Sequence, residues 1–170
     1  KVNAKLGTDY KLFNYYGAAD AEHVIVAMGS ACDTIEETID YLLAQGKKVG
    51  LVKVRLYRPF AVNAFVDAIP ATAKQITVLD RTKEPGALGE PLYLDVVAAL
   101  KQAGKFQDVP VFTGRYGLGS KDCNPAQIIA VYNNKDKAKF TIGIEDDVTG
   151  LSLAIGENPN TTPEGTTCCK

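Results

Sequence analysis

Histidine is nearly absent from the 170-residue sequence, which contains only His23. Catalytic triads and many zinc sites depend on histidine, so a single one leaves little room for either kind of site. His23 stands at the start of an apolar run, where a side chain at a strand edge is a commoner interpretation than a metal ligand. No nucleophile has a candidate base near it in the sequence, and we predict neither a catalytic residue nor a metal site.

Cysteine is also scarce. The four cysteines are Cys32, Cys123, Cys168 and Cys169. They have neither the C-x-x-C spacing of metal or cluster ligation nor the density of a disulfide framework. We therefore expect reduced thiols and no metal or iron–sulfur cluster bound to this chain.

Neither sign of charge is in excess, because 19 Lys and Arg stand against 20 Asp and Glu, for a formal net charge of −1. This balance disfavours binding to nucleic-acid phosphates or to an anionic membrane surface. No apolar stretch approaches the roughly 20 residues that a membrane helix needs, and the polar start lacks the apolar core of a signal peptide. We expect a soluble, cytoplasmic protein with no nucleic-acid or membrane partner.

What the sequence does contain is a series of short apolar runs, typical of strands that are covered on both faces of a sheet. The runs span residues 23–29, 48–57, 75–80, 109–114 and 139–147. Apolar residues at helical spacing separate them. The first of these helices is predicted to begin with Asp33 as its cap and Glu36 at the reciprocal position. The other predicted helix boundaries lie at Gly46, Pro70, Pro91, Gly104 and Asn124.

Alternating strands and helices with short connections predict the α/β fold class, with a doubly wound, mainly parallel sheet and helices on both faces. We assign residues 23–149 to this domain. Residues 1–22 form an aromatic, irregular segment expected to pack across a sheet edge, and residues 150–170 are expected to be an extended linker. The absence of an initiating Met and the polar ending suggest a piece cut from a longer protein.

Charged side chains follow nearly every predicted strand. Ligands of open α/β sheets gather at the carboxyl ends of the strands, where arginines and helix N-termini favour small anions. The same charges could instead pair with one another or with a neighbouring domain. The candidate residues of both interpretations are Ser30, Arg58, Asp80, Arg81, Lys83, Glu84, Arg115 and Lys121. The run "GRYGLGS" lacks the third glycine of a dinucleotide fingerprint.

Several longer segments resemble the single-chain pyruvate:ferredoxin (or flavodoxin) oxidoreductases. The most specific are "LYRPF", "LDRTKEPG", "GRYGLGSK" and "GIEDDVTG", which stand in the family's order along nearly the whole chain. The chain resembles the second domain of that family, a relative of the transketolase C-terminal domain. The resemblance implies that this is an internal fragment of a much longer enzyme.

For that longer enzyme, the resemblance implies oxidative decarboxylation of pyruvate with coenzyme A to acetyl-CoA and CO₂. Thiamine diphosphate with Mg²⁺ and [4Fe–4S] clusters are the implied cofactors, all held by other domains, and ferredoxin or flavodoxin accepts the electrons. A homodimer is also implied, and the isolated piece is expected to be inactive.

The favoured interpretation of the charged loops is therefore contact with other domains or subunits. Two alternatives stay open. The loops could form an anion-binding module for coenzyme A or another phosphate ligand, or the parent could be a related 2-oxo acid oxidoreductase.

Overall fold

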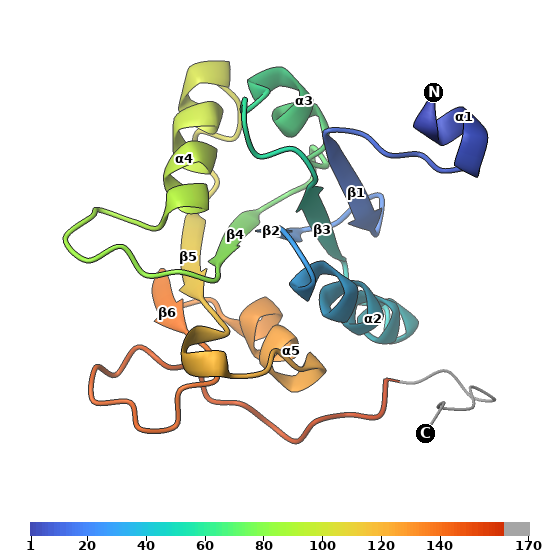
Figure 1. Ribbon diagram of the computed structural model, residues 1–170. Coiled ribbons are helices and arrows are strands. Elements are labelled where there is room, and N and C mark those ends of the chain that lie inside the picture. Colours follow the sequence, from blue (N-terminus) through green and yellow to red (C-terminus); the bar gives the residue numbers. More distant parts are fainter. Residues whose placement is uncertain (162–170) are drawn as a thin grey trace.

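The computed structural model describes residues 1–161, which fold around one six-stranded sheet (Figure 1). Its strands are β1 (Phe13–Gly17), β2 (His23–Ala27), β3 (Val49–Val54), β4 (Gln75–Asp80), β5 (Val111–Arg115) and β6 (Lys139–Thr141). They lie in the order β1-β3-β2-β4-β5-β6. Only β1 runs antiparallel to its neighbour, so the predicted mainly parallel sheet is confirmed.

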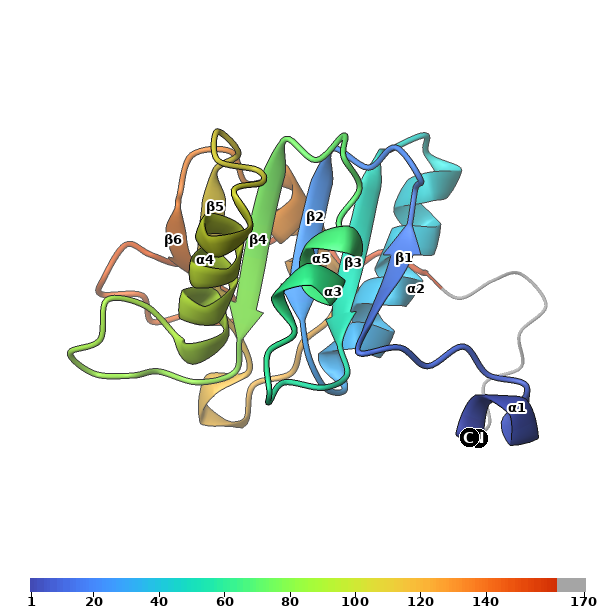
Figure 2. The same cartoon turned by 90° about the horizontal axis from the view of Figure 1, so that it is seen from above.

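Helices cover both faces of the sheet (Figure 2). Helices α2 (Ala31–Ala44) and α5 (Pro125–Asn133) pack on one face, and α3 (Val62–Asp67) and α4 (Pro91–Ala103) pack on the other. A short helix α1 (Val2–Leu6) precedes β1, and a 3₁₀ turn η1 (Leu118–Ser120) follows β5. No helix within residues 1–161 is long and apolar enough to cross a membrane.

Two apolar layers form the core, one on each side of the sheet. Every residue of β2 and of β4 is buried, because these strands lie at the centre with helices above and below. Ile25 of β2 packs in the layer of α2 and α5, whereas its neighbours Val24 and Val26 pack in the layer of α3 and α4. This alternation explains why the strands appear in the sequence as continuous apolar runs.

The connections leave β2 in two directions. The chain passes through α2 to β3 on one side of β2, and then through α3 to β4 on the other side. The carboxyl ends of β2 and β4 therefore mark the point where the winding reverses, which is where open α/β sheets bind their ligands.

Some predicted boundaries were wrong. Asp33 does not cap α2: the helix begins at Ala31, and the Asp33 N–H donates to the Ser30 carbonyl at 3.1 Å. The last strand ends at Thr141 instead of residue 147, because Gly143 takes a φ of 77° and turns the chain out of the sheet.

The first 22 residues are also more regular than predicted, since they contain strand β1 and helix α1. At the other end, Leu153 bonds back to Thr141, and residues 162–170 of the predicted linker lie outside the described residues. The domain boundaries at residues 22 and 149 stay a prediction.

Candidate functional site

A hollow of about 390 Å³ lies at the carboxyl edge of the sheet, where the winding reverses. Ser30 follows β2 on one wall, and Asp80 and Arg81 end β4 on the other. A second hollow of about 230 Å³ adjoins it and shares Ser30, Arg81 and Tyr116 with it. The fold therefore places the candidate site at the position that a ligand of an α/β sheet would take.

Helix α2 presents its first turn to the smaller hollow, which Ser30, Ala31 and Thr34 line. The left-handed φ of 78° at Gly29 lets the chain turn sharply from β2 into the helix. The Ser30 side chain makes no capping hydrogen bond to the described residues. The positive end of the helix dipole thus faces the hollow, a polarity that favours anions.

Two cations join this helix end. Arg81 and Lys121 both line the smaller hollow, as does the acidic Asp122. The Arg81 Nε–H donates to the Gly117 carbonyl at 3.4 Å, and a Cβ added at Gly117 would lie only 2.8 Å from that Nε. A glycine at position 117 is thus what allows the Arg81 side chain to lie against the backbone. The structure brings together Ser30, Arg81 and Lys121 out of the predicted set.

Asp80 has a structural task instead. Its two carboxylate oxygens accept the backbone N–H groups of Leu92 at 3.0 Å and Tyr93 at 3.2 Å, in the first turn of α4. Burial raises the pKa of Asp80 above its ordinary value, although these two donors oppose the shift. The side chain that ends β4 therefore caps the next helix across the 81–90 loop.

Arg115 is also committed to a partner. At the end of β5 it forms an ion pair with Glu90, whose side chain is only 2% exposed. The other Glu90 oxygen accepts the backbone N–H of Glu84 at 2.7 Å. One buried carboxylate thus ties the 81–90 loop to β5. Glu90 was missed in the sequence, because nothing in "GEP" shows that this glutamate is buried.

Arg58 lines neither hollow and is paired as well. Its Nη2 lies 2.7 Å from the Asp95 carboxylate of α4, and its guanidinium stacks 4.0 Å from the centre of the Tyr57 ring. The Tyr57 hydroxyl donates to the same Asp95 at 2.6 Å. This cluster joins the end of β3 to α4 and leaves Arg58 outside both hollows.

Lys83 and Glu84 lie on the exposed 81–90 loop and line neither hollow. The apolar tip of that loop, Leu88, is 94% exposed. A charged loop with an exposed apolar tip is a surface suited to contact with another polypeptide.

The thiols near the site are unreactive. Cys32 and Cys123 are both free, and burial raises the pKa of each to about 11. Because the thiolate is the nucleophile and the metal ligand, both side chains stay in their inert form at neutral pH. Within residues 1–161, no three His, Cys, Asp or Glu side chains are grouped so that they could hold a metal ion.

Comparison with known proteins assigns the family. Residues 21–128 match the family model of the pyruvate:ferredoxin oxidoreductase core domain II, which is more than half of the 170 residues. The chain belongs to this family. As a core domain II chain, it is 56% identical to the pyruvate:ferredoxin oxidoreductase of Moorella thermoacetica, over 100% of this chain and 15% of that protein.

Other relatives match the chain with similar identity and over a similarly small share of their own length. The chain is 50% identical to the pyruvate-flavodoxin oxidoreductase of Enterobacter agglomerans, over 100% of this chain and 15% of that protein. It is 51% identical to the probable pyruvate-flavodoxin oxidoreductase of Escherichia coli K12, over 92% of this chain and 14% of that protein. The chain thus spans about 15% of the length of these curated relatives.

A solved structure shares the fold of this core domain II chain. It is the 2-oxoglutarate:ferredoxin oxidoreductase from Magnetococcus marinus with 2-oxoglutarate, coenzyme A and succinyl-CoA bound. The TM-score is 0.50 at 22% identity, over 77% of this chain and 20% of that one. This likeness supports the α/β fold of core domain II.

Proposed function

We propose that this chain is an internal part of a longer pyruvate:ferredoxin or pyruvate:flavodoxin oxidoreductase, in which it serves mainly as a scaffold that contacts other domains. The observation that carries this proposal is the 50% to 56% identity, along 100% of the chain, to enzymes of those names. In this proposal the boundaries of the α/β domain lie at residues 23 and 149.

In this proposal the longer protein converts pyruvate and coenzyme A to acetyl-CoA and CO₂, and passes the electrons to ferredoxin or flavodoxin. Thiamine diphosphate with Mg²⁺ and [4Fe–4S] clusters supply the carbanion and electron-transfer chemistry from other domains. Residues 1–161 do not fit a cluster, because several cysteine thiolates hold such clusters and only two free cysteines, the buried Cys32 and the half-buried Cys123, lie in this range. The proposal includes a cytoplasmic homodimer, on the basis of the family resemblance.

The pairing of the edge charges supports a scaffold role. Asp80 caps α4, Arg115 pairs with Glu90, and Arg58 pairs with Asp95. These contacts fix the shape of the carboxyl edge from within, and they leave most of the 81–90 loop exposed as a surface for a neighbouring domain. Because these internal contacts already hold the loops in place, no bound ligand is needed to position them.

A domain exchange tests this function. The matching segment of the Moorella thermoacetica enzyme is replaced by residues 1–170 of this chain, and pyruvate-dependent reduction of ferredoxin is measured with coenzyme A present. We expect the hybrid to keep most of its activity and to prefer pyruvate over 2-oxoglutarate as before, because a scaffold carries no substrate pocket. A folded, cofactor-loaded hybrid without activity, or with a changed substrate preference, would contradict the proposal.

A second candidate function is an anion-binding module for coenzyme A or another phosphate ligand. The observation that favours it is the meeting of Ser30, Arg81 and Lys121 with the start of α2 around the smaller hollow. Calorimetric titration of the chain with coenzyme A tests it directly. Saturable binding supports the module if Arg81→Glu abolishes it and Lys83→Glu preserves it. Lys83→Glu is the control, because it makes the same change of charge outside the hollows. If a folded sample gives no heat of binding with coenzyme A, the module is ruled out.

A further inference from the structure

The polar groups at the carboxyl edge fall into two classes. Asp80, Arg115 and Arg58 are each engaged by a partner within the chain. The Arg81 Nη atoms and the Lys121 ammonium have no hydrogen-bond or ion-pair partner among residues 1–161. Both of these cations line the smaller hollow. Charged groups that border a hollow and have no internal partner are available to orient a ligand.

A buried tyrosine stands between the two hollows. Tyr116 follows β5, is 6% exposed and lines both of them. Its backbone N–H donates to the Asp80 carbonyl at 3.2 Å, which fixes the residue against the end of β4. Its hydroxyl makes no hydrogen bond to any of the described residues 1–161. Because nearly all buried hydroxyls are hydrogen-bonded, this one is a polar group that a ligand in the hollows can satisfy.

The surroundings of Tyr116 keep its hydroxyl a donor. Burial raises the pKa of Tyr116 to about 12, and the charge of Arg81 opposes the shift. The hydroxyl therefore keeps its proton at neutral pH. Since Tyr116 and Arg81 border the same two hollows, a hydroxyl and a guanidinium can donate to one anionic group there.

The charges around the smaller hollow favour a ligand with a single negative charge. Its lining contains the cations Arg81 and Lys121 and the anion Asp122, so one positive charge is in excess. A carboxylate supplies one negative charge and suits the planar fork of an arginine. A phosphate monoester carries about 1.5 to 2 negative charges at pH 7, which is more than this lining balances.

The larger hollow places apolar surface next to these charges. Met28, Leu79 and Leu92 line it, together with Tyr116. Asp80 also borders it, but both of its carboxylate oxygens already accept N–H groups of α4. At about 390 Å³ the larger hollow has the size of a small-molecule site. The apolar part of a ligand would lie here while its charged group lies in the smaller hollow.

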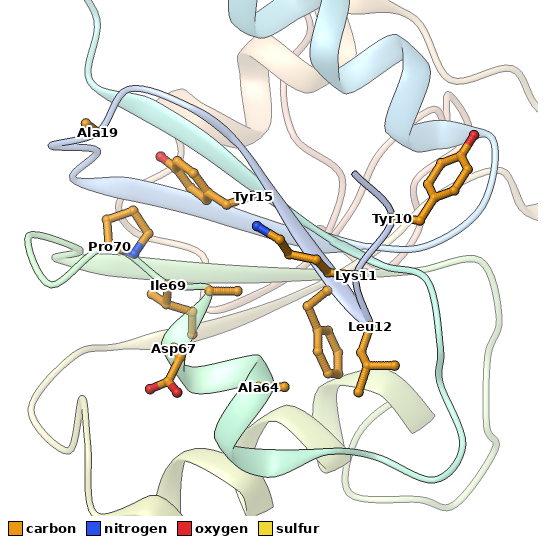
Figure 3. A pocket seen from close by; sticks show the side chains of 11 residues that line it. Tyr10, Lys11, Leu12, Tyr15, Ala19, Ala64, Asp67, Ile69 and Pro70 are labelled. Atoms are coloured by element: carbon orange, nitrogen blue, oxygen red, sulfur yellow. The ribbon is translucent and has the colours of Figure 1, made fainter. Parts of the chain in front are cut away.

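The groove between β1 and α3 provides a contrast (Figure 3). It is larger, at about 830 Å³, and its lining includes the charged side chains of Lys11 and Asp67. Both are exposed and already paired, Lys11 with Asp9 at 3.1 Å and Asp67 with Lys105 at 3.4 Å. The hollows at the carboxyl edge are therefore distinguished by their unpaired polar groups and not by their volume.

We propose that the two adjoining hollows form one binding site for a monocarboxylate with a compact apolar body. Its carboxylate meets Arg81 and the Tyr116 hydroxyl, and its body lies against Leu79 and Leu92. The site binds this ligand without reacting with it. The ligand class differs from the phosphate ligands of the second candidate function, and the proposal does not depend on the scaffold role. Tyr116 was missed in the sequence, because its burial between two hollows is a tertiary feature.

Calorimetric titration of the 170-residue chain with phenylacetate tests the site, and we expect saturable binding. Acetate lacks the apolar body and phenylacetamide lacks the charge, so each should bind about tenfold more weakly or worse. Arg81→Met should raise the phenylacetate dissociation constant by about tenfold or more, because it removes a charge-assisted contact. Lys83→Met is the control, since it removes a cation outside both hollows, and it should bind phenylacetate like the unmodified chain.

Tyr116→Phe and Tyr132→Phe form a matched pair. The Tyr116 hydroxyl has no partner among the described residues, so Tyr116→Phe should keep the urea midpoint of unfolding and raise the phenylacetate dissociation constant by about tenfold. The Tyr132 hydroxyl donates to the Gly50 carbonyl at 2.9 Å and borders neither hollow. Tyr132→Phe should therefore lower the urea midpoint and leave the phenylacetate affinity unchanged.

Titration with coenzyme A in parallel separates this proposal from the anion-binding module. Binding of coenzyme A without binding of phenylacetate would overturn the proposal and leave the module standing, and binding of neither would overturn both. The proposal is also wrong if acetate binds as tightly as phenylacetate, or if Tyr116→Phe keeps the affinity of the unmodified chain.

Discussion

Glu90 and Arg115 show how much one buried ion pair contributes at the carboxyl edge. The side chain of Glu90 is 2% exposed and that of Arg115 is 13% exposed. Arg115→Met would leave the Glu90 carboxylate buried without its partner, and we expect the free energy of unfolding to fall by about 3–5 kcal/mol. Urea unfolding followed by circular dichroism measures the change.

The double variant Glu90→Gln with Arg115→Met separates the cost of leaving a buried carboxylate unpaired from the contribution of the ion pair itself. Removing both charges takes away the unpaired carboxylate, so the double variant should recover a large part of the stability lost by Arg115→Met. Lys83→Met, on the exposed part of the same loop, should have almost no effect. A double variant no more stable than Arg115→Met would show that the pair is not what stabilises this edge.

His23 is buried at the amino edge of the sheet, where it begins β2. Its Nδ1 lies 3.1 Å from the Tyr132 carbonyl and its Nε2 lies 2.8 Å from the Thr77 hydroxyl, which describes a neutral ring that donates once and accepts once. Burial lowers the pKa of His23 from 6.5 to about 4, and the charge of Lys135 adds to this shift. The lone histidine of the sequence is thus a buried side chain whose two ring nitrogens are both hydrogen-bonded.

A pH dependence of stability follows from that pKa. Because the folded pKa is below the unfolded value, the contribution of His23 is complete above pH 6.5 and is lost as the pH falls towards 4. The full shift corresponds to about 3 kcal/mol. We expect the free energy of unfolding, measured in urea at several pH values, to fall over this range. His23→Gln should show a flatter profile, and parallel profiles for the two proteins would contradict the assignment.

At the scale of elements, the start of helix α4 depends on a residue of β4. Asp80 accepts the first-turn N–H groups of Leu92 and Tyr93. Asp80→Ala leaves both donors without their acceptor, and we expect a loss of about 1–2 kcal/mol in thermal or urea unfolding. Asp80→Asn keeps one acceptor oxygen and should lose less.

Helix α5 offers the comparison for this prediction. Its cap Asn124 accepts a single N–H, from Gln127 at 3.0 Å, within its own helix. Asn124→Ala should therefore cost less than Asp80→Ala, about 1 kcal/mol or below. Equal losses at the two positions would mean that the link between β4 and α4 adds nothing beyond an ordinary cap.

The parallel part of the fold could be predicted because its signals are local. Pro91 and Gly104 mark the ends of α4, and Asn124 caps α5, as the sequence indicates. Strand β1 gave no such signal, since its residues are mostly half-buried and its pairing with β3 is a tertiary contact. The last strand was predicted too long, because apolar residues continue past Thr141 while the backbone turns away at Gly143.

The candidate site could be predicted as a region but not residue by residue. Topology alone places the ends of β2 and β4 together, and Ser30 and Arg81 line the same hollow there. Which charges are paired depends on side-chain packing that a sequence does not show. Asp95, the partner of Arg58, and Glu90, the partner of Arg115, were both missed for this reason.

At the scale of the whole molecule, one edge of the sheet is covered by a later segment of the same chain. Residues 151–153 run beside β6, and Lys137 holds them there: its Nζ donates to the carbonyls of Gly150 and Ser152, both at 2.8 Å. An edge covered in this way cannot recruit another strand, whereas β1 can. The two edges of the described sheet therefore differ in how much of their backbone is left open.

Removing the Lys137 ammonium should weaken this protection without unfolding the domain. In Lys137→Met we expect faster amide hydrogen exchange at Thr141 and Leu153, whose N–H groups close the β6 edge, while the free energy of unfolding changes by about 1 kcal/mol or less. Lys139→Met is the control, since Lys139 is exposed on β6 and has no hydrogen bond from its side chain to the described residues. If exchange at Leu153 stays as slow as in the unmodified chain, residues 151–153 are held by their strand contact alone, and the Lys137 bridge contributes nothing to closing the edge.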